Sequence, residues 1–278
     1  SSSSSSSSIA PTARIYTDLF MPTLKKIVND TKKIDWSSDS EQLRLIVTLF
    51  RRSAHVIHKH LPVVLPLMRE CCGDVDNSPQ TRIGMLSLLL QLVERSNTSE
   101  WHRYAANLTE KVVLPNMVWR NGDTAATIRL TAIRILDRVM ASVDADCRED
   151  IARKLSKALV TLETCLEESD TRIRMLMARV FEALLSCCSS DDNDLLIDEL
   201  ALSKLYPKLL DRLDDSDDEV RVAFASTLGA LICRAFPPAE SFDRTGQFFS
   251  YIVKHSLIHL DDSNEDVVIL VVVVVVVV

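Results

Sequence analysis

The feature that most constrains the fold of this chain is a repeat with a nearly constant period. Six similar dipeptides end at residues 44, 82, 129, 174, 221 and 268, so that successive gaps are 38, 47, 45, 47 and 47 residues. The last residue is arginine in the first five and valine in the sixth. A polar residue lies six positions earlier in every unit: Ser38, Asp76, Asp123, Glu168, Asp215 and Asp262. A periodic array of this kind is built from stacked copies of one supersecondary unit.

Each unit contains two amphipathic helical segments. In the unit near residue 200, apolar residues recur at helical spacing over residues 202–213 and again over residues 220–232. An Asp-Asp-Ser turn at 214–216 separates the two segments. The phase of the first stripe places Leu210 in the core and Arg212 at the surface. Each unit is therefore predicted to be a helical hairpin.

A capping pattern marks where the second helix of a unit begins. Ser216 and Glu219 have the spacing of a capping box, in which the two side chains bind the free amides of the first helical turn. Ser38 and Glu41 repeat the spacing. The pattern predicts that Ser216 and Ser38 are the capping residues.

A period of about 40–47 residues with two helices per unit is typical of HEAT and armadillo repeats, and the acid-x5-Arg spacing favours HEAT. We therefore expect an all-α fold, an α-solenoid of about six HEAT-type helical hairpin repeats that forms one domain over residues 9–270. Only five of the 278 residues are glycine, which argues against Gly-rich nucleotide-binding loops and against an all-β fold. The serine run at 1–8 and the valine run at 271–278 are predicted to be artefacts or placeholders on a fragment of a longer chain.

The repeats resemble the HEAT-repeat family. In that family the turn acid and the arginine of the second helix form a ladder that joins adjacent repeats. The resemblance implies this role for Asp76 and Arg82, Asp123 and Arg129, Glu168 and Arg174, and Asp215 and Arg221. The first and last units depart from the pattern, with Ser38 and Val268 at the ladder positions. We expect the ladder arginines to be partly exposed, so that removal of Arg174 has a moderate cost.

Two stretches carry a more specific resemblance. Residues 205–215, continued by 219–221 and 225–228, and the His-Leu-Asp-Asp segment at 259–262 are similar to the C-terminal HEAT repeats of the dynein axonemal assembly factor 5 family. The strong resemblance covers about residues 200–270. It implies a cytoplasmic factor that helps to pre-assemble the dynein arms of motile cilia. The implied partners are axonemal dynein chains and other assembly factors or chaperones, and no cofactor is implied.

Charge is unevenly distributed along the chain. Residues 1–140 carry a net charge of +5 and residues 141–278 a net charge of −12. The basic side chains near the start form a candidate protein-binding group: Lys25, Lys26, Lys32, Lys33, Arg51 and Arg52. A solvated surface is the alternative interpretation of this group. Nucleic-acid binding is not expected, because the chain is acidic overall and only Trp36 lies near this group.

The chain lacks the residue patterns of catalytic and metal sites. His255 and His259 have the spacing of a metal-binding pair, but the H-E-x-x-H signature is absent. The acidic run at 214–219 lacks the central glycine and the length of a calcium loop. The seven cysteines form no C-x-x-C motif, which indicates reduced thiols. The apolar stretch from Val267 spans 12 residues, fewer than the ~20 that cross a membrane.

These observations predict a non-catalytic, cytoplasmic protein-binding scaffold without cofactors, metals, nucleic acid or membrane contacts. The specific resemblance favours a factor for axonemal dynein assembly. Another HEAT adaptor, such as a phosphatase scaffold or a nuclear transport receptor, is the alternative.

Overall fold

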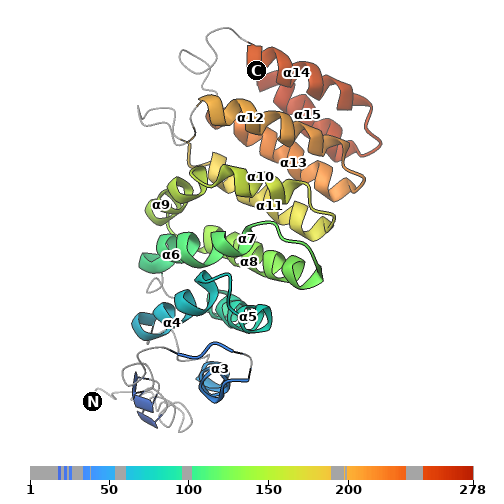
Figure 1. The fold of residues 1–278 in the computed structure, drawn as a ribbon. Helices are drawn as coiled ribbons and strands as arrows, with labels where there is room; N and C mark the ends of the chain where they lie inside the picture. The colour runs from blue at the N-terminus through green and yellow to red at the C-terminus, as the bar shows by residue number, and fades with distance from the viewer. Residues whose placement is uncertain are drawn as a thin grey trace, which may run out of the picture. The chain divides into compact units, whose positions relative to one another are not determined.

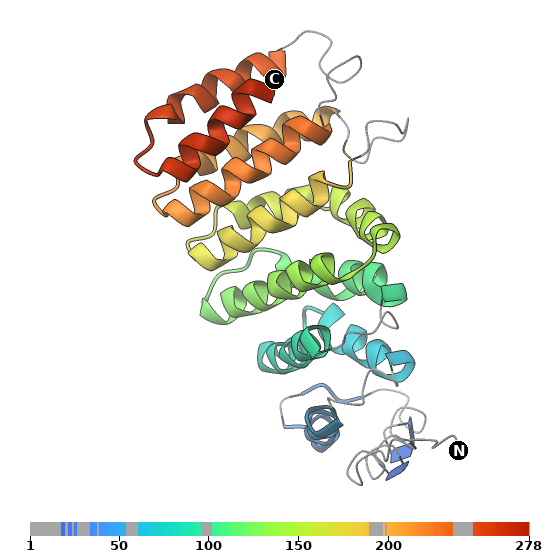
Figure 2. The same ribbon diagram turned by 180° about the vertical axis from the view of Figure 1, so that it is seen from behind.

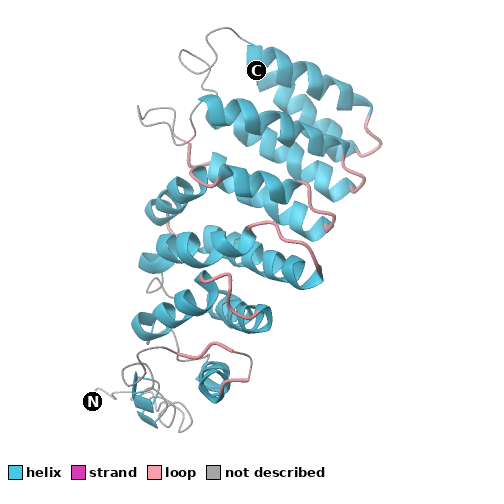
Figure 3. Cartoon of the chain, viewed as in Figure 1, coloured by secondary structure: helices cyan, strands magenta, loops and turns pink. Residues whose placement is uncertain are grey.

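The computed structural model describes most of the chain as helices joined by short turns. The described residues are 18–19, 22–23, 25–26, 34–37, 39–53, 61–95, 102–188, 197, 199–235 and 247–277. The chain divides into two compact units, Ser1–Trp101 and His102–Val278, called unit 1 and unit 2. Within the described residues every regular element is a helix, and Figure 3 shows helices and loops without strands. The prediction of an all-α chain is confirmed.

Unit 1 contains three described helices: α3 (Glu41–Ser53), α4 (Leu61–Gly73) and α5 (Pro79–Arg95). The turn at 74–78 joins α4 and α5 into a hairpin, and α3 packs against α5. The large side chains of Trp36 and Phe50 are buried in this unit. An apolar stripe on each helix therefore supplies the core of unit 1.

Unit 2 contains four successive helix pairs among its described residues. The second helices of the pairs are α8 (Asp123–Ser142), α11 (Thr171–Leu185), α13 (Asp218–Ala230), which η6 (Leu231–Ala235) extends, and α15 (Glu265–Val277). The first helices consist of shorter segments: α6 (His102–Leu108), η4 (Thr109–Val113) and α7 (Leu114–Met117); α9 (Ala145–Ser156) and α10 (Leu159–Leu166); α12 (Glu199–Leu210) and η5 (Asp211–Asp214); α14 (Gln247–Ser256) and η7 (Leu257–Asp261).

The helix pairs of unit 2 stack in the order of the sequence (Figure 1). In the second-helix layer α8 packs on α11, α11 on α13 and α13 on α15, and Figure 2 shows these four helices side by side. The turns from first to second helices lie along one edge of the unit, where Figure 3 draws them as pink loops. This arrangement is that of an α-solenoid, in which each pair buries its apolar stripes against the next.

Aspartates, rather than serines, cap the second helices of the second and third pairs, α11 and α13. Asp170 accepts a hydrogen bond from the backbone amide of Arg172 at the start of α11. Asp217 accepts from the amides of Glu219 and Val220 at the start of α13. The predicted capping box at Ser216 was wrong by one residue, because the helix begins at Asp218 and its cap is Asp217. A carboxylate at this position is also stabilised by the positive end of the helix dipole.

A π-helical turn interrupts the first helix of the first pair. The amide of Leu114 donates to the carbonyl oxygen of Thr109, five residues earlier. The next residue, Pro115, has no N–H, and in a continuous α-helix its ring would clash with the carbonyl of Lys111. The wider turn of η4 accommodates the proline, and the buried Asn116 side chain donates 2.6 Å to the carbonyl oxygen of Val112.

Leu210 is 5% exposed, as predicted, but Arg212 is half-buried rather than exposed. Its side chain is 24% exposed, and its Nη1 donates to the carbonyl oxygen of Leu166 in the preceding pair at 3.2 Å. The prediction of an exposed arginine was wrong because the partner carbonyl lies 46 residues away in sequence.

Several predictions about the ends and the repeats remain open. The HEAT class, the count of six repeats and the single domain over 9–270 stay predictions, as does the artificial origin of the runs at 1–8 and 271–278. Residues 271–277 continue the helix α15, which buries Val271 and Val274. Across the described residues, none of the helices has both the length and the apolar character that a membrane crossing requires.

Candidate functional site

Ion pairs join consecutive helix pairs of unit 2 at the turn edge. Arg174 on α11 reaches the turn of the next pair, where its Nε and Nη2 donate to the two carboxylate oxygens of Asp215 at 2.7 and 2.9 Å. Its Nη1 donates to the backbone carbonyls of Glu168 and Ser169 in its own turn at 2.8 and 3.0 Å. One guanidinium thus fixes two successive turns in a bidentate geometry.

The same link recurs one pair later. The Nε and Nη2 of Arg221 donate to the carboxylate of Asp262 at 2.8 and 3.0 Å, and its Nη1 donates to the carbonyl oxygen of Asp215 at 2.9 Å. Sequence reasoning set the last unit apart because Val268 occupies its arginine position. Asp262 nevertheless supplies the carboxylate of a link. It lies 41 residues after Arg221, just as Asp215 lies 41 residues after Arg174, and this equal spacing could have predicted the pair from the sequence.

A third link joins the first two pairs of unit 2. The Nε of Arg129 lies 2.5 Å from the Oε1 of Glu168, and both side chains are buried. The Nη1 of Arg129 donates to the carbonyl oxygen of Arg120 at 2.7 Å. Together, Arg129–Glu168, Arg174–Asp215 and Arg221–Asp262 form the turn ladder.

The structure does not bring every predicted ladder residue into such a link. Asp123 is exposed in the first turn of α8, where its backbone carbonyl accepts from the Thr127 hydroxyl. In unit 1, Asp76 is exposed, whereas Arg82 is buried and donates to the carbonyl oxygen of Val75 at 3.0 Å. Two arginines do contact the acid six residues earlier, since Arg174 binds Glu168 and Arg221 binds Asp215. In both cases the arginine binds the backbone carbonyl of that residue and not its carboxylate.

The ladder is more deeply buried than the sequence suggested. The side chains of Arg174 and Asp215 are 9% and 3% exposed, so the expectation of a partly exposed arginine at 174 was wrong. The ladder side chains become buried when consecutive pairs pack together at the turn edge. The sequence of a single repeat does not show how close this packing is. Loss of one partner from a buried pair leaves a charge without compensation, which is far more costly than loss of a surface pair.

Two of the ladder carboxyls, Asp215 and Asp262, have a pKa below the ordinary value of an aspartate. Burial alone would raise the pKa of Asp215, but hydrogen bonds from the Arg174 guanidinium and the Asp217 amide outweigh it, and the pKa is lowered. The hydrogen bonds from Arg221 lower the pKa of Asp262, against a smaller opposing effect of burial. The pairs Arg174–Asp215 and Arg221–Asp262 are thus fixed charge pairs that join consecutive helix pairs.

The candidate basic group lies in unit 1. Lys25, Lys26 and Arg51 are exposed, and Arg52 lies in α3. Lys32 and Lys33 lie outside the described residues. Lys25, Lys26 and Arg51 therefore present positive charge to solvent, and the role of the group as a binding surface stays a prediction.

The face formed by the second helices of unit 2 carries another group of arginines. Arg134 and Arg138 on α8 and Arg179 on α11 are exposed. Asp137 lies beneath them, 3.8 Å from the Nη1 of Arg179, and is 9% exposed. Burial raises the pKa of Asp137, while the charges of Arg179 and Arg138 act in the opposite direction.

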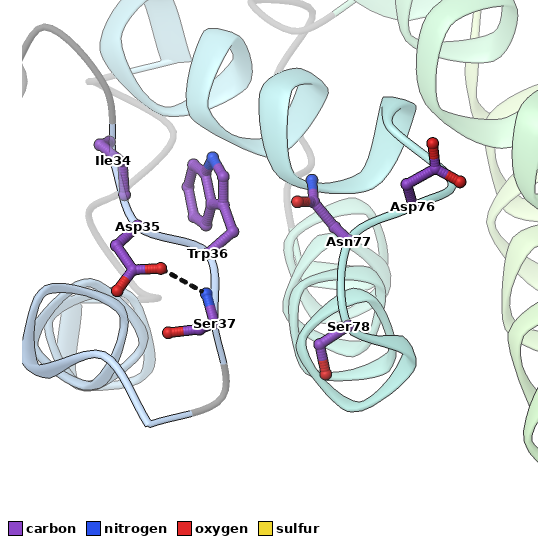
Figure 4. A pocket seen from close by; sticks show the side chains of 7 residues that line it. All are labelled: Ile34, Asp35, Trp36, Ser37, Asp76, Asn77 and Ser78. Atoms are coloured by element: carbon purple, nitrogen blue, oxygen red, sulfur yellow. Dashed lines mark hydrogen bonds between the residues drawn. The ribbon is translucent and has the colours of Figure 1, made fainter.

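An open pocket in unit 1 was not predicted from the sequence. Figure 4 shows it between the segment before α3 and the turn before α5. Its volume is about 610 Å³, and its lining residues are Ile34, Asp35, Trp36, Ser37, Asp76, Asn77 and Ser78. Asp35 accepts from the amide of Ser37 at 3.0 Å, and the indole N–H of Trp36 donates to Glu70 at 3.1 Å. The carboxylates of Asp35 and Asp76 point away from each other in Figure 4, so the pocket holds no converging pair of acids.

No group of His, Cys, Asp and Glu side chains suited to a metal ion occurs among the residues that the structure describes. The ring of His255 packs on Tyr251 with centroids 4.0 Å apart. In the acidic run at 214–219, Asp215 belongs to the ladder and Asp217 caps α13. These residues therefore have structural contacts that account for them.

Comparison with known proteins gives a consistent result at the level of sequence. The chain is 28% identical over 249 residues to dynein axonemal assembly factor 5 of Homo sapiens, which covers 87% of this chain. The proteins of the same name from Xenopus laevis and Mus musculus are 29% and 27% identical, and each alignment covers 82% of this chain. The chain resembles dynein axonemal assembly factor 5. The similarity predicted from residues 200–270 is confirmed and extends over most of the chain.

The chain spans between 26% and 28% of the length of these relatives. No protein-family model matches it. Among solved structures, the crystal structure of an engineered protein, determined by the Northeast Structural Genomics Consortium, superposes with a TM-score of 0.53. That match covers 91% of this chain and 95% of the engineered protein at 13% sequence identity, and it supports the fold alone.

Proposed function

We propose that this chain is a non-catalytic protein-binding scaffold that takes part in assembling axonemal dynein arms in the cytoplasm. The similarity to dynein axonemal assembly factor 5 of three species, over 82–87% of the chain, carries the proposal. The fold is compatible with it, because a stack of helix pairs offers an extended surface for other proteins.

The turn ladder supplies the mechanism by which the chain would act as a scaffold. Each arginine binds the acid of the next pair and the backbone of its own turn, so that the position of one pair fixes the position of the next. A surface with fixed spacing loses little conformational entropy when a partner binds. The scaffold works by holding a client or a chaperone on this surface, and no step requires a cofactor.

Capture from ciliated cells tests the proposal. The protein that carries this chain is tagged in cells that build motile cilia, and bound proteins are identified by mass spectrometry. Axonemal dynein chains and other assembly factors are expected in the captured fraction. Recovery of a protein phosphatase, or binding to a Ran-type GTPase that depends on the nucleotide, would instead favour the alternative adaptor functions.

A charge-reversal variant tests where the client binds. Lys25, Lys26, Lys32 and Lys33 are changed together to Glu, and the protein of unchanged charge is captured in parallel at low and high salt. We expect recovery of dynein chains to fall in the variant and in high salt, because exposed charges are screened within ~10 Å at 0.1 M salt. Equal recovery at low salt would show that the basic group is only a solvated surface.

A further inference from the structure

The ladder residues of unit 2 hold fixed places relative to the second helices, and unit 1 has residues at the same places. In unit 2 the acid lies three residues before the helix, as Asp215 does before α13, and the arginine is the fourth residue of the helix, as Arg174 is in α11. In unit 1 these places belong to Asp76 before α5 and to Arg44 in α3. The register would therefore place an ion pair between Arg44 and Asp76.

The structure does not form this ion pair. Arg44 and Asp76 are both exposed, and neither forms an ion pair with any residue that the structure describes. Arg174, by contrast, is buried between two successive turns. Between the corresponding turns of unit 1 lies the open pocket of Figure 4, and its volume of about 610 Å³ is in the range of ligand-binding pockets. A pocket thus replaces the arginine link.

One wall of this pocket is apolar and held in place. Ile34 and Trp36 line it and are 4% and 6% exposed. The indole N–H of Trp36 donates to Glu70, and the carbonyl oxygen of Trp36 accepts from the hydroxyl of Thr81 at 3.2 Å. Because its ring and its backbone are both fixed before a ligand arrives, little entropy is lost on binding. A fixed aromatic ring suits the flat face of a guanidinium.

The facing side of the pocket supplies hydrogen-bond acceptors. The Nδ2 of Asn77 donates to the backbone carbonyls of Glu70 and Cys71 at 3.3 and 2.9 Å. Both amide hydrogens are thereby used, and the Oδ1 of Asn77 is the end that can accept a further hydrogen bond. In Figure 4 the side chain of Asn77 points toward Trp36. A donor placed between these two side chains therefore meets an aromatic ring and an acceptor.

The charge of the pocket is negative. Its seven described lining residues include two acids, Asp35 and Asp76, and no base. The hydrogen bond from the Ser37 amide lowers the pKa of Asp35, so this carboxylate is ionised at neutral pH. The two carboxylates lie on opposite sides of the pocket (Figure 4), which favours one monovalent cation between them over a metal ion that needs converging ligands.

We infer that this pocket binds an arginine side chain of a partner protein, at the place that a ladder arginine occupies between the turns of unit 2. The guanidinium stacks on Trp36, donates to the Oδ1 of Asn77 and is attracted by Asp35 and Asp76. Its flat shape and five donors suit these walls better than the compact ammonium of lysine does. The inference goes beyond the role in dynein assembly and does not depend on it.

The test compares two peptides that differ only in charge. One is a short glycine–serine peptide with a central arginine, and the other carries citrulline, which has nearly the shape of arginine but no charge. Binding to the purified intact protein is measured by saturation-transfer NMR, which detects weak binding to a large protein. We expect the arginine peptide to bind at least tenfold more tightly. No tighter binding of the arginine peptide than of the citrulline peptide would overturn the inference.

Two double variants separate the pocket from general attraction to acidic turns. Asp35→Asn/Asp76→Asn removes both charges of the pocket and should weaken binding of the arginine peptide at least fivefold. Asp39→Asn/Glu41→Gln is the matched control, because these two acids are exposed nearby but do not line the pocket. It removes the same charge and should change binding less than twofold. Equal effects of the two double variants would show that the peptide is held by charge outside the pocket.

Arg44 itself is the competing occupant. We expect Arg44→Ala and Asp76→Asn each to shift the melting temperature by less than about 2 °C, as substitutions at exposed sites do. If each variant lowered it more than this and the double variant lowered it no further, Arg44 would fill the pocket and bind Asp76. That result would overturn the inference. Circular dichroism of every variant verifies that the helices are intact.

Discussion

Removal of the Arg174 side chain is expected to destabilise unit 2 severely. The guanidinium donates two hydrogen bonds to the carboxylate of Asp215, one each to the carbonyls of Glu168 and Ser169, and a long one of 3.5 Å to the hydroxyl of Thr171. Arg174→Ala would leave a carboxylate that is 3% exposed without its bidentate partner and two carbonyls without this donor. The Nη1 of Arg212, 3.7 Å from the Oδ2 of Asp215, would remain as a more distant counter-ion. Breaking a buried ion pair from one side costs about 3–5 kcal/mol, a large fraction of the stability of an ordinary domain.

A second arginine on the same helix provides the control. Arg172 also forms a bidentate pair, with its Nε and Nη2 at 3.0 and 2.6 Å from the carboxylate of Asp170, but its side chain is 73% exposed. Arg172→Ala is expected to change the denaturation midpoint little, because water replaces the lost contacts.

Urea denaturation followed by circular dichroism measures both variants. The midpoint should fall strongly for Arg174→Ala and little for Arg172→Ala, with similar slopes if the transition stays two-state. The double variant Arg174→Met/Asp215→Leu removes both charges and should recover most of the loss. Equal effects of the two single variants would refute the assignment of Arg174 to a buried link.

Three further predictions follow from burial and charge. Leu210→Asp buries a charge on the apolar stripe of α12 and should cost more than ~3 kcal/mol in urea denaturation, spreading to the neighbouring pairs. The lowered pKa of Asp215 means that its carboxylate stabilises the folded state at a pH above ~3.9, the pKa of an aspartate in an unfolded chain. This contribution is lost as the pH falls through the folded-state pKa. Asp215→Asn should therefore make the melting temperature fall less steeply as the pH is lowered below about 4. Cys233 is exposed, whereas burial raises the pKa of Cys165 to about 11 and that of Cys188 to about 12, so a thiol reagent at neutral pH should label Cys233 rapidly and the other two only on unfolding.

Local patterns in the sequence were sufficient to predict the helices. The apolar stripe over 202–213 and the stripe over 220–232 lie in α12 with η5 and in α13 with η6, because helical periodicity is set by residues three and four apart. Helix starts were less predictable. Ser216 and Asp217 both suit a cap, and only the path of the turn decides that Asp217 is used.

Contacts between repeats were harder to predict than contacts within them. The spacing of six residues between Glu168 and Arg174 is visible in the sequence, but the carboxylate that Arg174 binds lies 41 residues further on. Burial of the ladder depends on how closely consecutive pairs pack, which no single repeat encodes.

Electron microscopy of axonemes tests the central claim most directly. Cells that build motile cilia are depleted of the protein that carries this chain, and dynein arms are counted in axoneme cross-sections with and without re-expression of the intact protein. A factor for dynein-arm assembly predicts axonemes that form but lack arms, with the arms restored on re-expression. A full set of arms in the depleted cells would contradict the proposed function, whatever the fold.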